Sequence, residues 1–261
     1  MDRRSQIPPE VNARLPRGTF LLAYRGSHAH GTYMPPTQPT GIDDVDLLGA
    51  CVGPTETYLG FNRFEQSEFW QGDHDVVVYE VRKLFRLLLQ ANPNVLGLLW
   101  LRPDHYLYSN YWGTRLVKER DRFSSLRAYD AFVGYAHSQL KRMERCHHQG
   151  YMGAKRKALV ERFGFDTKNA AHLIRLFLMG SEFVRNGVLR VDRTGIDADE
   201  LIQIKTGNRS LEWVKARADD LFESMREAKE RSPLPKHPDE EGAERLLMEI
   251  VRAYIDTPVR H

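Results

Sequence analysis

Three aspartates have the spacing of a metal site. Asp44 and Asp46 stand two residues apart at the start of an apolar run, and Asp75 immediately precedes a second apolar run at 76–79. Side chains alternate across a strand, so Asp44 and Asp46 would project from one face. Two carboxylates this close repel each other unless a cation neutralises them, and Mg²⁺, or Mn²⁺ in its place, fits best. On an adjacent strand, Asp75 would complete a cluster for two ions, one activating a hydroxyl and one gripping a triphosphate.

A Gly-Ser pair upstream suits phosphate binding. Gly26 and Ser27 directly follow the apolar run 19–24. Glycine lets backbone N–H groups approach a phosphate closely, and serine adds a hydroxyl donor. Each feature alone is common, because an isolated Asp-x-Asp pair more often caps a turn and a lone Gly-Ser is usually only a turn. Their order along the chain favours nucleotidyl transfer, which needs a phosphate grip on one side and in-line attack on the other.

Basic residues in the second half could neutralise phosphates. Lys157 closes a run of three cations that a helix would spread over most of a turn. Lys168, His172 and Arg175 follow at helical spacing, so they share one helix face among apolar neighbours. A basic stripe on a buried helix is costly unless it lines a cleft that holds an anion. A solvated helix face for the cations, and a hydrogen-bonded core position for His172, are open alternatives.

The spacing of apolar residues changes near residue 80. Short apolar runs at 19–24, 45–52 and 76–79 predict strands, and the three prolines of 28–43 predict a loop. Helical spacing then predicts one helix that begins at residue 81 and a short one at 94–101. Further helices are predicted near 109–120, 127–148, 154–163, 167–187, 198–206, 210–231 and 240–255. An extended segment is expected at 188–191 and a Pro-rich linker at 232–239. We therefore expect an α+β fold, with a small sheet domain over residues 1–108 and a helical domain over 109–261.

Positive charge is concentrated in one stretch, residues 114–162, which we call the basic junction. The chain has 261 residues, with 38 Lys and Arg against 35 Asp and Glu. The basic junction holds 12 basic and 5 acidic residues, a net charge of +7, whereas the segments on either side are each net −2. This asymmetry predicts an anionic ligand rather than general solubility.

The composition excludes several classes of protein. With 41% hydrophobic residues, the chain can bury a core and is not disordered. It has no run of about 18 apolar residues, so no transmembrane helix is expected, and its charged, Pro-rich start is unlike a secretory signal. Two distant cysteines argue against a disulfide scaffold and suit a reducing cytosol. We expect a cytoplasmic protein without a membrane partner.

The motifs together resemble the DNA polymerase β-like nucleotidyltransferase superfamily, whose members carry a Gly-Ser turn, an Asp-x-Asp pair and a third Asp on a later strand. More narrowly, the chain resembles a family of predicted bacterial and phage nucleotidyltransferases from about residue 20 to about residue 215. The resembling stretches are residues 25–31, 44–47, 81–84, 91–96 and 166–176. The resemblance implies a small mixed-sheet nucleotidyltransferase domain. It also implies that the metal ligands are Asp44, Asp46 and Asp75. The residues that it implies for binding the phosphates of the donor nucleotide are Gly26 and Ser27.

Two positions depart from the family pattern. The loop between Ser27 and Asp44 is longer than usual and carries a Pro-rich insert at 34–40, which could reshape the entrance for the acceptor. Gly97 stands where relatives often carry an acidic residue after Asn-Pro-Asn. If that acid contributes to activity in the relatives, the chemistry at this position is altered here.

These observations favour a Mg²⁺-dependent nucleotidyltransferase. It would pass a nucleoside monophosphate from an NTP to an acceptor hydroxyl, on an RNA or tRNA end or on a protein, and release pyrophosphate. Asp75, or else Asp46, would help to deprotonate the hydroxyl. Two other functions compete with this hypothesis. One is a non-catalytic nucleic-acid-binding module that uses the basic junction and keeps a degenerate nucleotide pocket. The other is a metal-dependent phosphohydrolase, for which His74 is the available histidine ligand.

Overall fold

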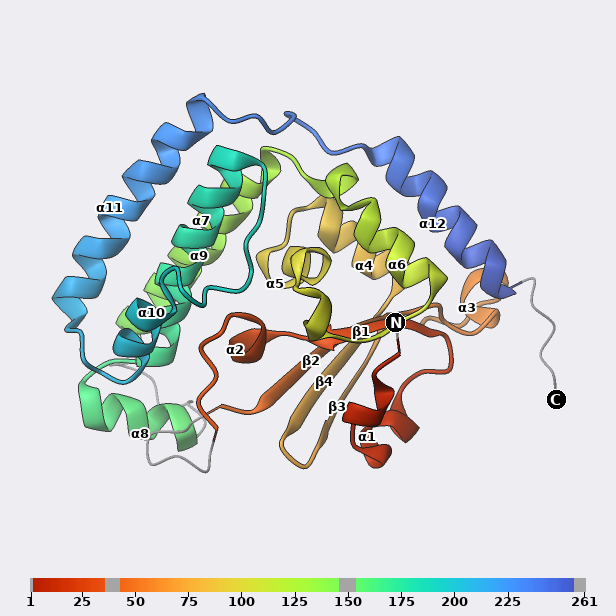
Figure 1. The fold of residues 1–261 in the computed structure, drawn as a ribbon, viewed down its shortest axis with the longest axis horizontal. Helices are drawn as coiled ribbons and strands as arrows, with labels where there is room; N and C mark the ends of the chain where they lie inside the picture. The colour runs from red at the N-terminus through yellow and green to blue at the C-terminus, as the bar shows by residue number, and fades with distance from the viewer. Residues whose placement is uncertain (1, 36–42, 146–153, 256–261) are drawn as a thin grey trace. The chain divides into compact units, whose positions relative to one another are not determined.

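The computed structural model describes residues 2–35, 43–145 and 154–255 (Figure 1). The chain forms two compact units. The sheet unit comprises residues 1–29, 44–124 and 237–261, and the helical unit comprises residues 30–43 and 125–236. Among the described helices, none is long and apolar enough to cross a membrane.

A five-stranded mixed sheet forms the centre of the sheet unit. Its strands are β1 (Thr19–Tyr24), β2 (Val45–Cys51), β3 (Gln66–Gln71), β4 (His74–Glu80) and β5 (Tyr106–Ser109). They are arranged in the order β3-β4-β2-β1-β5, with β2 and β4 parallel and the other neighbours antiparallel. The expected α+β fold is confirmed, and three of the strands were predicted. The edge strands β3 and β5 were not.

One face of the sheet packs against the N-terminal segment. Ile7 and Val11, from the η1–α1 region, join a core that includes Leu22, Leu47 and Val76 from the strands. Side chains alternate along a strand, so the residues next to these core positions point to the opposite face. This parity fixes the direction of the polar side chains at the strand ends.

The opposite face is covered by α4 (Val81–Leu89) and α6 (Tyr111–Lys118), with α1 (Pro9–Arg14) on the other side (Figure 1). The helix α12 (Glu240–Ile255) packs on α4. Gly113 lets α6 lie directly on β1, because a Cβ at this position would come within 2.5 Å of the Phe20 carbonyl oxygen. The remaining elements of the unit are short: α2 (Gly26–Ala29), α3 (Glu56–Leu59), α5 (Pro93–Leu96), η1 (Arg4–Gln6), η2 (Gly97–Trp100), η3 (Pro103–His105) and η4 (Arg120–Phe123).

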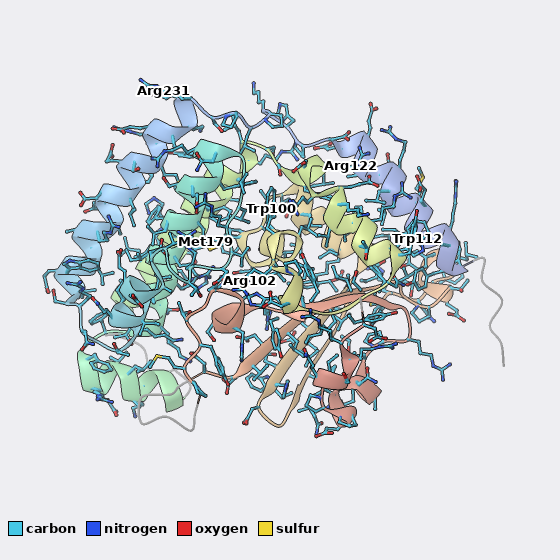
Figure 2. All side chains as sticks on the ribbon, in the orientation of Figure 1. Trp100, Arg102, Trp112, Arg122, Met179 and Arg231 are labelled. Atoms are coloured by element: carbon cyan, nitrogen blue, oxygen red, sulfur yellow. The ribbon has the colours of Figure 1, made fainter. Side chains whose placement is uncertain are left out.

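Polar contacts join α12 to elements far away in the sequence. Asn110 Nδ2 donates to Tyr254 Oη at 2.8 Å. Arg122, labelled in Figure 2, forms ion pairs with Glu119 and with Asp239, the residue just before α12. The last described helix is therefore an integral part of the sheet unit.

The helical unit is built around α9 (Thr167–Asn186), which packs against α7 (Arg127–Arg145), α10 (Ala198–Lys205) and α11 (Leu211–Glu230). A further helix, α8 (Ala154–Phe163), also contacts α9. Gly180 permits the close approach of α7, since a Cβ there would meet the Phe132 side chain at 2.8 Å. Residues 188–191, expected to be extended, lie outside any described helix or strand.

The two compact units divide the chain differently from the expected domains 1–108 and 109–261. Residues 109–124 and 237–261 lie in the sheet unit, and residues 30–43 lie in the helical unit. Apolar periodicity identifies a helix but not the surface on which it packs. The helix α6 packs on β1 and α12 packs on α4, so both helices belong with the sheet.

Candidate active site

Two of the three aspartates face each other on neighbouring strands. In the parallel pair β2–β4, Asp46 lies directly opposite Asp75. Leu47 and Val76, the next residue along each strand, belong to the core on the α1 side. Asp46 and Asp75 therefore project together from the other face. Asp75 thus stands on the strand adjacent to the one that carries Asp46, which is the condition for a shared carboxylate cluster.

Arg25 links these two carboxylates. It follows β1, and its backbone N–H donates to the Asp46 carbonyl oxygen at 2.9 Å. Its Nη2 lies 2.8 Å from Asp75 Oδ2 and 3.7 Å from Asp46 Oδ1. The other carboxylate oxygen, Asp75 Oδ1, is buried and has no hydrogen-bond partner among the described residues. The Arg25 guanidinium thus lies close to both carboxylates, but it does not bond to Asp75 Oδ1.

The third aspartate, Asp44, precedes β2 and is half-buried. Over residues 2–35, 43–145 and 154–255, no group of three or more His, Cys, Asp or Glu side chains is placed to hold a metal ion. The donor chemistry still fits a divalent cation, because Asp46 and Asp75 are paired in register and Asp75 Oδ1 has no hydrogen-bond partner in the described part of the chain. The metal-binding roles of Asp44, Asp46 and Asp75 remain predictions.

The turn after β1 packs directly on Asp46. Gly26 begins α2 with a φ of 61°, a conformation that residues with a Cβ adopt at a cost. A Cβ on Gly26 would lie 2.1 Å from Asp46 Oδ2. Ser27 follows in the same turn and is half-buried. The glycine is therefore required on two counts, its backbone conformation and its approach to a carboxylate.

Comparing Gly26→Ala with the same substitution at a control glycine separates these two requirements. The left-handed conformation costs about 1–2 kcal/mol with a Cβ present, and the Asp46 side chain must also rotate away. Gly72 is a matched control, because it has a φ of 57° and a Cβ added to it would meet nothing within 4 Å. We expect Gly26→Ala and Gly72→Ala both to lower the free energy of unfolding in urea titrations, and Gly26→Ala to lower it more because of the contact with Asp46. Only Gly26→Ala should reduce nucleotidyl transfer, and an equal loss of transfer in both variants would contradict this.

A buried charge cluster in the helical unit involves the predicted residue Lys168. Asp43 is buried, and its Oδ2 accepts from the Met34 N–H at 2.9 Å and from Lys205 Nζ. Lys168 Nζ lies 3.3 Å from Asp43 Oδ1, and Lys205 Nζ also donates to the Thr32 carbonyl oxygen at 3.0 Å. Lys168 is consequently ion-paired with a carboxylate that sequence analysis did not assign to the site.

Arg175 has a different environment, since it forms no ion pair with any described residue. Its hydrogen bond runs from Nη1 to Met179 Sδ at 3.4 Å, and Met179 is labelled in Figure 2. Burial, together with the nearby Arg193 guanidinium, lowers the pKa of Arg175 to about 10. Arg193 is itself neutralised by Glu182, at 2.6 Å, and by Asp197. The Arg175 charge is thus uncompensated among the described residues, which is the environment of an anion-binding group.

His30 shares this environment. Its Nδ1 lies 3.2 Å from the Val191 carbonyl oxygen. Burial, and secondarily the Arg175 charge, hold the pKa of His30 well below its usual value. A neutral His30 adds no further positive charge beside Arg175.

Replacing Arg175 with methionine distinguishes an anion-binding arginine from a structural one. Removing an uncompensated buried charge is expected to leave the free energy of unfolding unchanged or to raise it by about 1 kcal/mol. If Arg175 binds phosphate, pyrophosphate or ATP should raise the melting temperature of the wild type more than that of Arg175→Met, because the variant lacks this cation. Arg185→Met, on the exposed side of the same helix, is the control. A loss of stability above about 2 kcal/mol would show a structural role.

Comparison with known proteins adds the decisive observation. Residues 10–249 match the family described as RlaP, the RNA repair pathway DNA polymerase beta family. The chain belongs to the RlaP family. It is thereby a DNA polymerase β-like nucleotidyltransferase by family, as the Gly-Ser and Asp-x-Asp motifs predicted.

Other comparisons place the RlaP match in context. No curated protein matches the chain. A solved structure similar to it is that of a nucleotidyltransferase-like protein from Exiguobacterium sibiricum 255-15, with 14% sequence identity and a TM-score of 0.31. The match covers 96% of this chain and 79% of that one.

The remaining basic residue predicted for this RlaP-family chain is Lys157. It lies on α8 with a side chain that is 68% exposed, and its Nζ is 3.9 Å from Glu161 Oε1. This contact is a weak surface pair, so the solvated-face alternative describes Lys157 better than it describes Arg175. Part of the basic junction, residues 146–153, lies outside the described residues.

Sequence analysis missed several residues that shape the site. Arg25 carried a usable signal, because it is a cation at the end of a strand directly before Gly26. Asp43 directly precedes the Asp-x-Asp pair and Lys205 lies at the end of a predicted helix, so neither position carries its own signal for a site. Their pairing joins positions 162 residues apart, so no local pattern could have revealed it.

Proposed function

We propose that the chain is a metal-dependent nucleotidyltransferase that transfers a nucleoside monophosphate from an NTP to an acceptor hydroxyl. The observation that carries this proposal is the pairing of Asp46 and Asp75 on parallel strands, with the Gly26 backbone packed against Asp46. The RlaP family match supports the same class of activity.

In the proposed reaction, the acceptor oxygen bonds to the α-phosphorus of the NTP. The bond from that phosphorus to the oxygen bridging to the β-phosphate breaks, and pyrophosphate leaves with the electron pair. The hydroxyl proton passes to a carboxylate, for which Asp75 is the first candidate because its Oδ1 has no donor among the described residues. Asp46 is the alternative. A divalent ion held by Asp44, Asp46 and Asp75, Mg²⁺ or Mn²⁺, would neutralise phosphate charge and acidify the hydroxyl.

Phosphate binding is proposed separately for each unit. In the sheet unit, the backbone of Gly26 and the hydroxyl of Ser27 would bind phosphate oxygens. In the helical unit, Arg175 is the strongest candidate because its charge is uncompensated among the described residues. Lys168 would bind phosphate only if its ion pair with Asp43 were broken. Lys157 would bind phosphate only from the solvent-exposed surface of α8.

We propose the end of an RNA, such as a tRNA, as the acceptor. The family description names an RNA repair pathway, which favours an RNA hydroxyl over a protein hydroxyl. The positive charge of the basic junction is also of the kind that attracts a nucleic-acid backbone.

The test is transfer of label from each α-³²P NTP. The chain is incubated with Mg²⁺ or Mn²⁺ and with total RNA, tRNA or protein from a cell extract, and products are separated on denaturing gels. We expect labelled RNA with one or more of the four NTPs, and no labelling in EDTA. The proposal is rejected if no NTP labels any acceptor in either metal, or if label enters RNA equally well in EDTA.

One observation favours the non-catalytic alternative, a nucleic-acid-binding module. Arg25 already neutralises part of the charge of the carboxylate pair, and the described residues contain no group of three or more side chains placed to hold a metal ion. Under that alternative, NTP with Mg²⁺ leaves the melting temperature unchanged while RNA binding stays strongly dependent on salt. A rise in melting temperature that requires both NTP and metal would exclude it.

A further inference from the structure

Arg25 occupies the position where the proposed function needs a metal ion, and an inference about its role rests on that proposed function. Its guanidinium lies 2.8 Å from Asp75 Oδ2 and 3.7 Å from Asp46 Oδ1. These are the two carboxylates that face each other across β2 and β4. A cation bound by both aspartates must therefore share them with the guanidinium or displace it.

The charges indicate that the guanidinium neutralises this pair only in part. Arg25 brings one positive charge to two carboxylates, so its ion pairs by themselves leave a net negative charge. Asp75 Oδ1 has no partner among the described residues although it is buried. A divalent ion would neutralise both carboxylates and could also engage that oxygen.

The guanidinium is also able to leave. The Arg25 side chain is 28% exposed, so moving into water does not require the sheet to open. No other described residue bonds to its guanidinium, and its backbone N–H is bonded separately to the Asp46 carbonyl oxygen. The side chain can therefore move while the backbone of the turn stays in place.

We propose that Arg25 is a built-in counter-cation that holds Asp46 and Asp75 together and competes with the divalent ion for them. Metal binding then exchanges one cation for another, and the metal affinity is set by the difference between the two interactions. The displaced guanidinium stays next to the Gly26 turn. Arg25 is thus a positioning residue for the metal ligands.

The direct test measures Mn²⁺ affinity, by titration with the electron paramagnetic resonance signal of free Mn²⁺, in the full chain without nucleotide. We expect Arg25→Met to bind Mn²⁺ about tenfold more tightly than the wild type, because a charge-assisted hydrogen bond no longer opposes binding. Arg25→Lys, which keeps the charge, should remain near the wild type. Arg102→Met is the matched control, since Arg102 (Figure 2) pairs with Asp104 and not with the strand aspartates.

A second measurement uses the wild-type chain and so does not depend on a variant folding. Phenylglyoxal labels accessible arginines, and the labelled peptides are quantified by mass spectrometry. We expect Mn²⁺ to raise the labelling rate of Arg25 but not that of Arg102. An unchanged or lower rate at Arg25 would overturn the inference.

The outcomes separate this inference from the proposed function. Equal or weaker Mn²⁺ affinity in Arg25→Met overturns the inference, and so does an absence of Mn²⁺ binding in both proteins. If affinity tightens in Arg25→Met but no NTP yields transfer, the inference holds and the proposed function fails. If transfer occurs while affinity is unchanged, the proposed function holds and the inference fails.

Discussion

Replacing Asp46 or Asp75 with asparagine is expected to reduce nucleotidyl transfer by about a thousandfold. Charge stabilisation by a metal ion contributes several kcal/mol to a transition state, and about 4 kcal/mol corresponds to three orders of magnitude in rate. Asparagine keeps the size of the side chain but removes the charge. Initial rates of label transfer, measured under saturating NTP and Mg²⁺, check the prediction.

Asp73→Asn is the matched control for these variants. Asp73 is exposed and lies only two residues before Asp75, so its replacement should leave the rate within a factor of two or so. The double variant Asp46→Asn with Asp75→Asn should be no slower than the worse single variant, because groups that act as a unit are not additive. A wild-type rate in Asp46→Asn would refute the catalytic assignment.

Replacing Asp43 with alanine is expected to lower the free energy of unfolding by about 3–5 kcal/mol. Asp43 is buried between Lys168 and Lys205, and Lys205 is itself buried. Removing one partner of a buried ion pair leaves the other charge without compensation, which is strongly destabilising. The Met34 N–H loses its acceptor as well. Urea denaturation followed by far-UV circular dichroism measures the change.

Two companion variants make this stability prediction specific. Asp43→Asn keeps an acceptor for the Met34 N–H and should lose less stability than Asp43→Ala. Asp219→Ala removes an exposed carboxylate from α11 and should change stability by less than about 0.5 kcal/mol. If Asp43→Ala costs no more than Asp219→Ala, the cluster is not stabilising.

The sequence predicted the strands that carry Asp46 and Asp75 because those strands are encoded locally. The runs that form β1, β2 and β4 are apolar on both faces, so they are recognisable without knowledge of their neighbours. Asp46 and Asp75 stand near the start of two of these strands. Parallel pairing in register then brings them together, as the hypothesis of a shared metal site required.

The edge strands could not be predicted in the same way. β3 has the sequence QSEFWQ, in which only Phe69 is buried, so it has no continuous apolar run. β5 has four residues between a 3₁₀ turn and a helix, and its segment was absorbed into the helical part of the chain. Both strands are defined by the partner they pair with rather than by their own composition.

Charge compensation was likewise beyond the reach of local patterns. Lys168 and Arg175 look equivalent in sequence, as two cations on one helix face. The structure separates them, because Lys168 meets Asp43 and Arg175 meets no described carboxylate. The difference depends on which residue, distant in the sequence, contacts each side chain in the folded protein. Local sequence patterns do not contain this information.

The discontinuity of the sheet unit has a consequence for how the chain is made. α12 covers α4 with buried residues such as Ala243 and Leu246, yet it is synthesised after every other described element. At typical translation speeds, the ribosome needs roughly ten seconds to produce the intervening residues 125–236. During that interval, the apolar surface of α4 has no cover from α12. A nascent chain stalled after residue 236 should therefore recruit a chaperone that the completed protein does not bind.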